Sequence, residues 1–403
     1  MTLPATNGFA LLPAVQKGTT RLAFKLWDEM RPGGPYHGAA KSLLAALKEG
    51  GARVDLLASE KSSAAAAALR SDVKFAPNGC EVHVVPATAF NSDYWLRDIL
   101  LRATEIATGL PAATRTKNKE GFGKLRDWII ARFHLKQIDW PDILLDGGDS
   151  LVVDDRYWLL GAGSVSDMIR PQRGDPAWSQ ALAKIAHDVG RQPLVLGADS
   201  NTLSLTVRLL LSRVEEIAGL RKPGDPKGSQ PAGEATVQMT TGADLSADLV
   251  PANGEKSEWA HADMVVAVTG KTDDDGSPIV LVAEPTAKIC PQSKAATDAE
   301  EILGTIAKDL KAAGLKVIRN PAAYHQLGVL PYNNVIVQTD PDVVWLPTFG
   351  SDLEGMKAID DENIRIWHDD LKFAKVIPVP GWSQLASEQQ GCIRCATLPL
   401  PAT

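Results

Sequence analysis

The sequence predicts an α/β fold, because short apolar strands alternate with amphipathic helices along most of the chain. Pairs of strands typical of hairpins recur about five times, with turn residues between them. By usual domain length, 403 residues would suggest two or three domains, although a closed α/β architecture can hold residues 1–403 in one domain.

Composition narrows the possible partners. The net charge is −7, from 49 acidic and 42 basic residues, which argues against a general binder of nucleic acid or anionic membranes. The amino terminus lacks the pattern of a signal peptide, and no apolar run approaches the ~20 residues that span a bilayer. We therefore expect a cytoplasmic protein. The 4 cysteines are too few for a disulfide scaffold in so long a chain, so individual thiols are better candidates for chemistry.

In the first part of the chain, apolar spacing predicts a helix over residues 38–49, ended by Gly50 and Gly51. Further elements are predicted as a strand at 53–58, a helix at 62–70 and a strand at 80–86. The last strand leads into a loop that carries Asp98.

The middle of the chain is less regular. Residues 115–138 are rich in Lys and Arg and predict a solvated helix, which could alternatively border a substrate site. Asp146-Gly-Gly-Asp149 predicts a tight turn, followed by a hairpin over 150–154 and 157–160. Helices are predicted at 176–189 and 203–216 around a strand at 193–196, and residues 221–257 predict a surface insertion.

In the last part, a strand is predicted at 278–283, followed by a helix that begins with a capping box at Thr297 and ends near Gly314. Strands at 315–319, 334–338 and 343–347 complete the pattern.

The stretch 258–268 places the pair His261-Ala-Asp263 at the start of an apolar, β-branched run. We interpret this run as a strand, on which residues i and i+2 share a face, so the imidazole and the carboxylate would point to the same side. A lone pair of this kind is more often a packed histidine beside a solvated aspartate. Three further polar motifs argue for a site here: Trp95-Leu-Arg-Asp98, Leu145-Asp-Gly-Gly-Asp149 and Gly391-Cys-Ile-Arg-Cys395.

One thiol, one imidazole and several carboxylates indicate a particular chemistry. A thiol nucleophile needs an electropositive neighbour and an acid for the leaving group, and His261 can supply both. Carboxylates would oppose a thiolate unless a cation lies between them, so the pattern favours a cationic substrate. A guanidinium can be held by two carboxylates while a thiolate attacks its carbon.

These motifs, in this order, resemble the guanidine-modifying enzyme superfamily. The chain is most similar to the catalytic region of protein-arginine deiminases, and it also resembles agmatine deiminase, arginine deiminase and dimethylarginine hydrolase. The resemblance spans roughly residues 80 to 400. It rests on Cys80–Pro86 with Trp95–Asp98, on the Gly-Gly-Asp149 element, on His261-Ala-Asp263, on Leu330–Val335 with Leu346–Gly350, and on Gly391–Thr397.

The resemblance implies a pentein-type fold, a five-bladed propeller of ββαβ units around a central site in a single catalytic domain. It implies no cofactor and no metal. The implied catalytic residues are the nucleophile Cys395, the acid and base His261, and the guanidinium clamp Asp98 and Asp263. The implied substrate-binding residues are Asp149, Asp146, Trp95 and Arg394.

Two positions depart from the family pattern. Arg394 precedes the nucleophile where relatives usually carry His. Animal protein deiminases flank their Trp-x-x-Asp motif with acidic calcium ligands, whereas Asp98 is followed by Ile99 and Leu100. Calcium activation at this position is therefore not expected.

The expected function is hydrolysis of protein-bound arginine to citrulline and ammonia through a thiouronium on Cys395. The alternatives are a deiminase or dimethylarginine-type hydrolase of a free small guanidine such as arginine or agmatine, and an amidinotransferase. Cys392-x-x-Cys395 could instead be a redox pair or half a zinc site, although no second such pair is present. A non-catalytic arginine-binding relative should have lost Cys395 or His261, and both are present.

Overall fold

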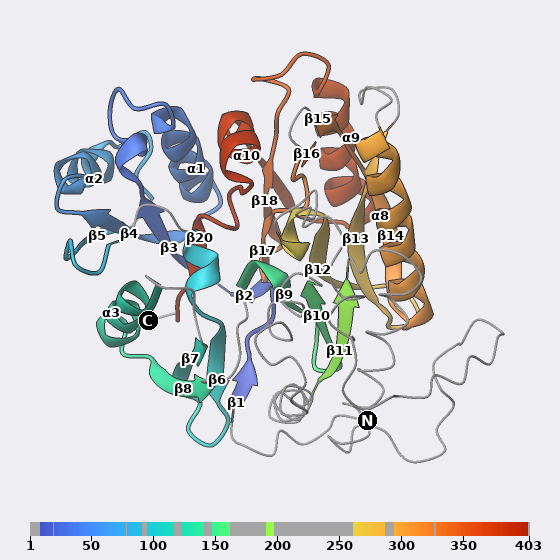
Figure 1. The fold of residues 1–403 in the computed structure, drawn as a ribbon, viewed down its shortest axis with the longest axis horizontal. Coiled ribbons are helices and arrows are strands. Elements are labelled where there is room, and N and C mark those ends of the chain that lie inside the picture. The colour runs from blue at the N-terminus through green and yellow to red at the C-terminus, as the bar shows by residue number, and fades with distance from the viewer. Residues whose placement is uncertain are drawn as a thin grey trace, which may run out of the picture.

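The computed structural model describes residues 9–18, 20–77, 79–90, 95–116, 122–140, 147–161, 191–196, 261–286, 294–325 and 328–401. The insertion expected at 221–257 and the helices expected at 176–189 and 203–216 lie outside the described residues. The described residues form a mixed α/β fold (Figure 1). The predicted α/β class is confirmed.

The strands are short, and most agree with the predicted ranges. They are β1 (Phe9–Leu11), β2 (Gln16–Lys17), β3 (Arg21–Leu26), β4 (Arg53–Ser59), β5 (Glu81–Val85), β6 (Arg102–Glu105), β7 (Pro111–Thr116), β8 (Lys136–Trp140), β9 (Ser150–Val152), β10 (Tyr157–Gly161), β11 (Gln192–Leu196), β12 (Val266–Thr272), β13 (Pro278–Pro285), β14 (Lys316–Ala322), β15 (Tyr324–His325), β16 (Gly328–Val329), β17 (Ile336–Thr339), β18 (Val343–Pro347), β19 (Lys375–Val379) and β20 (Thr397–Pro399).

The helices connect these strands. The α-helices are α1 (His37–Glu49), α2 (Ser63–Ser71), α3 (Phe122–Arg132), α8 (Lys294–Ala312), α9 (Lys357–Arg365) and α10 (Ser383–Gln389). Short 3₁₀ turns are η1 (Asp28–Met30), η2 (Leu96–Ile99), η3 (Gly147–Asp149) and η5 (Ala262–Met264), and a π-helical turn, η6 (Ile366–Asp370), follows α9.

Across the described ranges the strands form five sheets of three or four strands and one two-stranded sheet. One connection recurs in the larger sheets: two antiparallel strands, a crossover, and a third strand that returns parallel to the second. The five units are β6-β7-α3-β8, β9-β10-β11, β12-β13-α8-β14, β17-β18-α9-β19 and β20-β3-α1-β4. Residues 162–190, which join β10 to β11, lie outside the described residues. A parallel return needs a long crossover, and this explains the helices inside four of the units.

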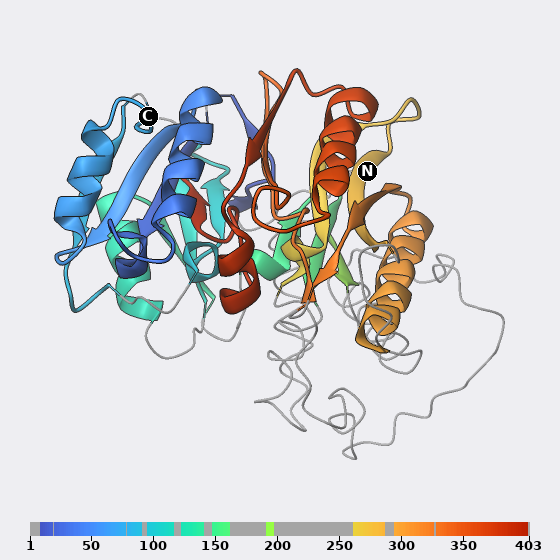
Figure 2. The same cartoon turned by 90° about the horizontal axis from the view of Figure 1, so that it is seen from above.

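The last unit joins the two ends of the chain. Strand β20 pairs antiparallel with β3, with Thr397 opposite Phe24 and Pro399 opposite Leu22. Near the amino terminus, β1 pairs with β6 and β2 pairs with β17, so the segment 9–17 bridges two other units. Helices α1, α2, α3, α8 and α9 lie towards the outside of the molecule, while β9, β17 and β20 lie nearer its centre (Figures 1 and 2).

Large side chains fill the space between helices and strands. Trp345 of β18 is fully buried, and its indole N–H donates to the carbonyl of Ala46 in α1 at 2.7 Å. Gly50, which ends α1, lies so close that a Cβ there would be 2.2 Å from the Trp345 ring. Burying a side chain of this size contributes about 3 kcal/mol or more, so this contact fixes α1 against its neighbouring unit.

Two local predictions were wrong. The basic stretch 115–138 is not one helix, because Arg115 lies in β7 and Lys136 in β8, with α3 between them. The capping box at Thr297 does not begin a helix, since α8 already starts at Lys294. In the described part of the chain, no helix has the length and apolarity needed to cross a membrane.

Candidate active site

The candidate catalytic groups lie close together because each of the five units carries one of them at the same place in the unit. Each unit carries one polar group just before its first strand: Asp98 before β6, Asp149 before β9, Asp263 before β12, Asn334 before β17 and Cys395 before β20. These five positions lie far apart in the sequence. The repeated unit therefore brings them to one place, and the fold itself assembles the site.

The Cys395 side chain lies at the centre of this cluster and is fully buried. Its Sγ lies 3.8 and 3.9 Å from the two carboxylate oxygens of Asp263, and it accepts a hydrogen bond from the Asn334 side-chain amide at 3.1 Å. Its carbonyl accepts the backbone N–H of Arg97 at 3.0 Å. These contacts hold the thiol on the segment that leads into β20.

His261 stands beside the thiol and is the more accessible of the two, with its side chain 13% exposed. The ligand atoms of His261, Asp263 and Cys395 all lie within 4.8 Å of one another. His261 Nδ1 also lies 3.7 Å from Asp98 Oδ1. One imidazole thus lies close to a thiol and to two carboxylates, within reach of proton transfer to a bound group.

The prediction that His261 and Asp263 lie on one strand was wrong. The prediction that both side chains lie close to Cys395 was correct. His261 caps the 3₁₀ turn η5, which contains Asp263, and the strand β12 starts only at Val266. The two side chains therefore approach Cys395 from a turn and not from one face of a strand. The apolar run begins after the pair, and only that run is extended.

The electrostatics of the cluster oppose a free thiolate. Burial raises the pKa of the Cys395 thiol, and the charge of Asp263 raises it further, while a hydrogen bond with His261 lowers it. The net shift of this pKa is upward, which disfavours the thiolate. A cation bound between the carboxylates would offset their effect on this pKa, as the sequence pattern indicated.

Arg394, the residue where relatives usually carry His, is paired with a predicted clamp residue. Its guanidinium donates to Asp263 Oδ2, and both side chains are buried. Arg97 lies in the same region, where burial lowers the pKa of its guanidinium to about 9 and the charge of Arg394 acts in the same direction. Two internal cations, Arg97 and Arg394, therefore lie near Cys395.

Asp98 and Asp149 are both buried and hold neighbouring backbone. Asp98 Oδ1 accepts the N–H of Gly148 at 3.1 Å, and Asp149 Oδ1 accepts the N–H of Ala262 at 2.7 Å. Asp149 thus positions the turn that carries His261, a supporting role that the sequence did not indicate. Asp146, the other predicted carboxylate, lies outside the described residues.

Two glycines allow this close packing. A Cβ on Gly148 would lie 2.7 Å from His261 Nδ1, and one on Gly161 would lie 1.8 Å from Asp149 Oδ1. Both distances are shorter than van der Waals contact, so a larger residue at either position would displace a site side chain. In the Gly-Gly-Asp motif, Gly148 is therefore required because a side chain there would collide with His261.

Trp95 lies at the edge of the cluster, 9% exposed. Its indole N–H donates to the carbonyl of Gln389 at 3.0 Å, and its ring lies 4.7 Å from that of Trp27. These contacts tie Trp95 to the segment just before Gly391 and the nucleophile. Contact with a substrate, which the sequence predicted for this residue, stays a prediction.

Asn334 was not identified from the sequence as a site residue. Besides its bond to Cys395 Sγ, its side-chain oxygen accepts the backbone N–H groups of Arg394 at 2.8 Å and Cys395 at 3.2 Å. The only indication in the sequence was the pair Asn333-Asn334 just before a predicted strand. Such pairs are common in turns, so the pattern alone carried little weight.

Two groups of described residues have a spacing that could hold a metal ion. The first is His261, Asp263 and Cys395, where a metal would have to displace Arg394 from Asp263. The second is Asp55, Glu81 and His83, in which Asp55 already pairs with His83 at 2.7 Å and with Arg21. Both groups adjoin arginines, which disfavours a bound cation.

Comparison with known proteins identifies the fold. No protein-family model and no curated protein matches the chain. Among solved structures, the chain is similar to an agmatine deiminase of C. jejuni, with a TM-score of 0.61 and 14% identity over 98% of this chain and 96% of the other. It is similar to an agmatine deiminase of Enterococcus faecalis, with a TM-score of 0.60 and 14% identity over 100% and 98%. A protein described as a candidate peptidyl-arginine deiminase gives 0.59 and 12% identity over 98% and 99%. The chain therefore has the fold of the guanidine-modifying deiminases that its motifs resemble.

Proposed function

We propose that this protein is a metal-independent hydrolase that deiminates a free small guanidine, releasing ammonia and a ureido product. The observation that carries the proposal is the cluster around Cys395, in which a thiol, His261 and Asp263 have their reactive atoms within 4.8 Å of one another. Asp98 lies on the other side of His261. This combination suits a planar cation attacked by a thiolate.

In the proposed reaction, the guanidinium binds between Asp98 and Asp263 and lowers the pKa of the Cys395 thiol. The proton of the Cys395 thiol passes to His261, and the thiolate adds to the guanidinium carbon. His261 then protonates the departing nitrogen, which leaves as ammonia, and a thiouronium remains on Cys395. Water gives a proton to His261 and attacks the same carbon. The C–S bond then breaks, the remaining hydroxyl proton passes to the Cys395 sulfur, and the neutral ureido product leaves, after which His261 releases its proton to solvent.

The choice of substrate differs from the first expectation. The motifs favoured protein-bound arginine, whereas the two agmatine deiminases support a small free guanidine. The nearly enclosed site also supports a slender substrate, since Cys395 and Asp263 are fully buried. We further propose that the five units surround this site as the blades of a propeller and that residues 1–403 form one catalytic domain.

The test is release of ammonia and ureido product from agmatine, free arginine, a methylated arginine and an arginine-containing peptide. We expect at least one free guanidine to be turned over with a kcat/KM about 100-fold above the peptide. Cys395→Ala should release no ammonia, while Cys392→Ser, a change at the neighbouring buried thiol, should keep most activity. No ammonia from any compound would refute the proposal, and a preference for the peptide would refute the choice of substrate.

A further inference from the structure

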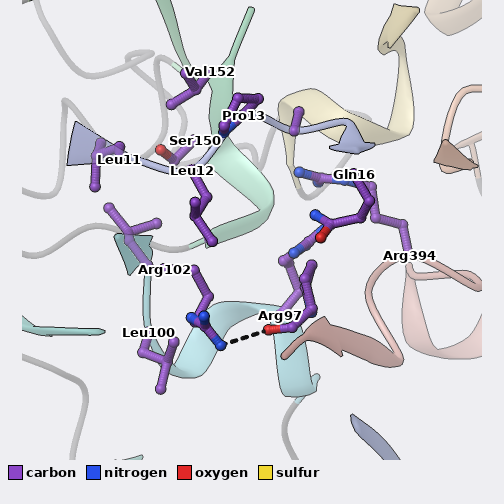
Figure 3. A pocket seen from close by; sticks show the side chains of 14 residues that line it. Leu11, Leu12, Pro13, Gln16, Arg97, Leu100, Arg102, Ser150, Val152 and Arg394 are labelled. Atoms are coloured by element: carbon purple, nitrogen blue, oxygen red, sulfur yellow. Dashed lines mark hydrogen bonds between the residues drawn. The ribbon is translucent and has the colours of Figure 1, made fainter. Parts of the chain in front are cut away.

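A second polar site lies next to the candidate active site. A pocket of about 40 Å³ opens between the segment 11–16 and residues of η2, β6, β9 and β20 (Figure 3). Three arginines line it, Arg97, Arg102 and Arg394, and none of its described lining residues is acidic. The lining is therefore basic, although Arg394 also pairs with Asp263.

This pocket is separate from the catalytic cluster. Arg102 follows Asp98 along the chain into β6, and Pro399 follows Cys395 into β20. Val152 of β9 lines the pocket in the same way, beyond the turn η3. The strands thus run from the catalytic groups towards the pocket, and Cys395 itself is not among the lining residues. A ligand in the pocket would therefore lie beside the catalytic groups, with Arg97 and Arg394 between them.

The arginines of the pocket lack partners for part of their guanidinium groups. Arg102 is 7% exposed and donates to the carbonyl of Pro399 at 3.0 Å, but its Nε has no hydrogen-bond partner within the described chain. The Nε of Arg97 is also buried without a partner in that part of the protein. Burial lowers the pKa of Arg102 to about 10 and that of Arg97 to about 9, so both remain charged at neutral pH. Arg394 already pairs with Asp263, and the charges of Asp263 and Asp98 act on Arg97, whereas burial alone shifts the pKa of Arg102. A buried charge without a counterion is costly, so Arg102 in particular favours an anion in the pocket.

We propose that this pocket binds a small inorganic anion, of halide to bicarbonate size, between Arg97, Arg102 and Arg394. A cavity of 10–15 Å³ by this measure holds about one water molecule, so about 40 Å³ admits an anion of a few atoms but excludes a large organic acid. The guanidinium forks supply the donors that such an ion prefers. The amide of Gln16, which also lines the pocket, can donate to it from the open side.

The direct test is crystallography of the full chain in bromide, whose anomalous signal locates it. We expect a bromide peak between the guanidinium groups of Arg97 and Arg102. The proposal is overturned if bromide occupies surface positions and the pocket contains only water. This experiment needs no variant, so it is independent of any effect of mutation on folding and of the identity of the substrate.

A second test uses thermal unfolding while bromide replaces gluconate at constant ionic strength. Gluconate is too large for the pocket and serves as the reference anion. We expect bromide to raise the Tm of the parent by about 2 °C relative to Arg102→Gln, because a ligand that binds only the folded state stabilises it. Arg365→Gln is the matched control, since Arg365 is exposed and pairs with Glu362 and Asp370. Equal bromide responses of the parent and of a folded Arg102→Gln would contradict the site.

Discussion

Asn334 offers the sharpest test of how this protein controls its thiol. Its side-chain N–H donates to Cys395 Sγ at 3.1 Å, and its oxygen accepts two backbone N–H groups from the segment that carries the nucleophile. The substitution Asn334→Ala removes all three contacts. Its neighbour Asn333 is also buried and bonds Asn320 and the carbonyl of Val265, without contacting Cys395, so Asn333→Ala is a matched control.

The size of the effect follows from these contacts. A hydrogen bond to a charged group contributes about 1.5–3 kcal/mol, and 1.36 kcal/mol corresponds to one pKa unit. Loss of the amide donor should therefore raise further the pKa of the Cys395 thiol, which burial and Asp263 already raise. At a pH below this pKa, kcat/KM should fall about 10- to 100-fold.

The assay is the pH dependence of alkylation of Cys395, followed by mass spectrometry of its peptide, together with the pH dependence of kcat/KM. Both variants should lower the free energy of unfolding by about 1–3 kcal/mol, because each leaves buried polar groups unpaired. Only Asn334→Ala should shift the alkylation profile to higher pH. An unchanged profile for Asn334→Ala, or an equal shift for Asn333→Ala, would refute the argument that this amide stabilises the thiolate.

Three further predictions follow from the site and its burial. Asp98→Asn should lower kcat/KM for a guanidinium substrate about 10- to 100-fold while affecting a neutral analogue little, and an unchanged kcat/KM would show that the clamp lies elsewhere. Activity should persist after dialysis against a chelator, because arginines adjoin the candidate metal ligands, and a loss reversed by calcium would contradict this. The free energy of unfolding in urea should fall as the pH rises from about 8.5 towards 11, and a flat profile would contradict it. Burial raises the pKa of the Cys392 thiol and raises that of Cys80 to about 11, so the folded chain keeps protons that the unfolded chain loses.

The fold class was predictable because its signals are local. Apolar spacing and a glycine stop located α1 to within one residue, and alternation located β4 and β18. The predicted end of an element was wrong where two sequence features indicate different ends. Thr297 appeared to begin a helix, yet Lys294 and two alanines before it are good helix formers, and α8 includes them.

Which residues lie together was predictable from the sequence, but their contacts were not. Motif order placed Cys395 and His261 in one candidate site, and the repeated unit of two antiparallel strands and a parallel return explains why they meet. The roles of Asn334 and Asp149 depend on partners 61 and 113 residues away, Cys395 and Ala262, and no local pattern contains them. The hydrogen bonds that support a site are therefore the hardest part of it to predict from the sequence.

Arg394 connects the two sites of this protein. It pairs with Asp263, the carboxylate proposed to hold the substrate, and it also lines the positive pocket. A guanidinium substrate is the same chemical group as the Arg394 side chain, so the proposed substrate would compete with Arg394 for the oxygens of Asp263. An anion bound in the pocket as proposed would offer Arg394 another partner and weaken its hold on Asp263. A histidine at this position has a shorter side chain and offers no guanidinium fork, so this competition is a consequence of the departure at Arg394.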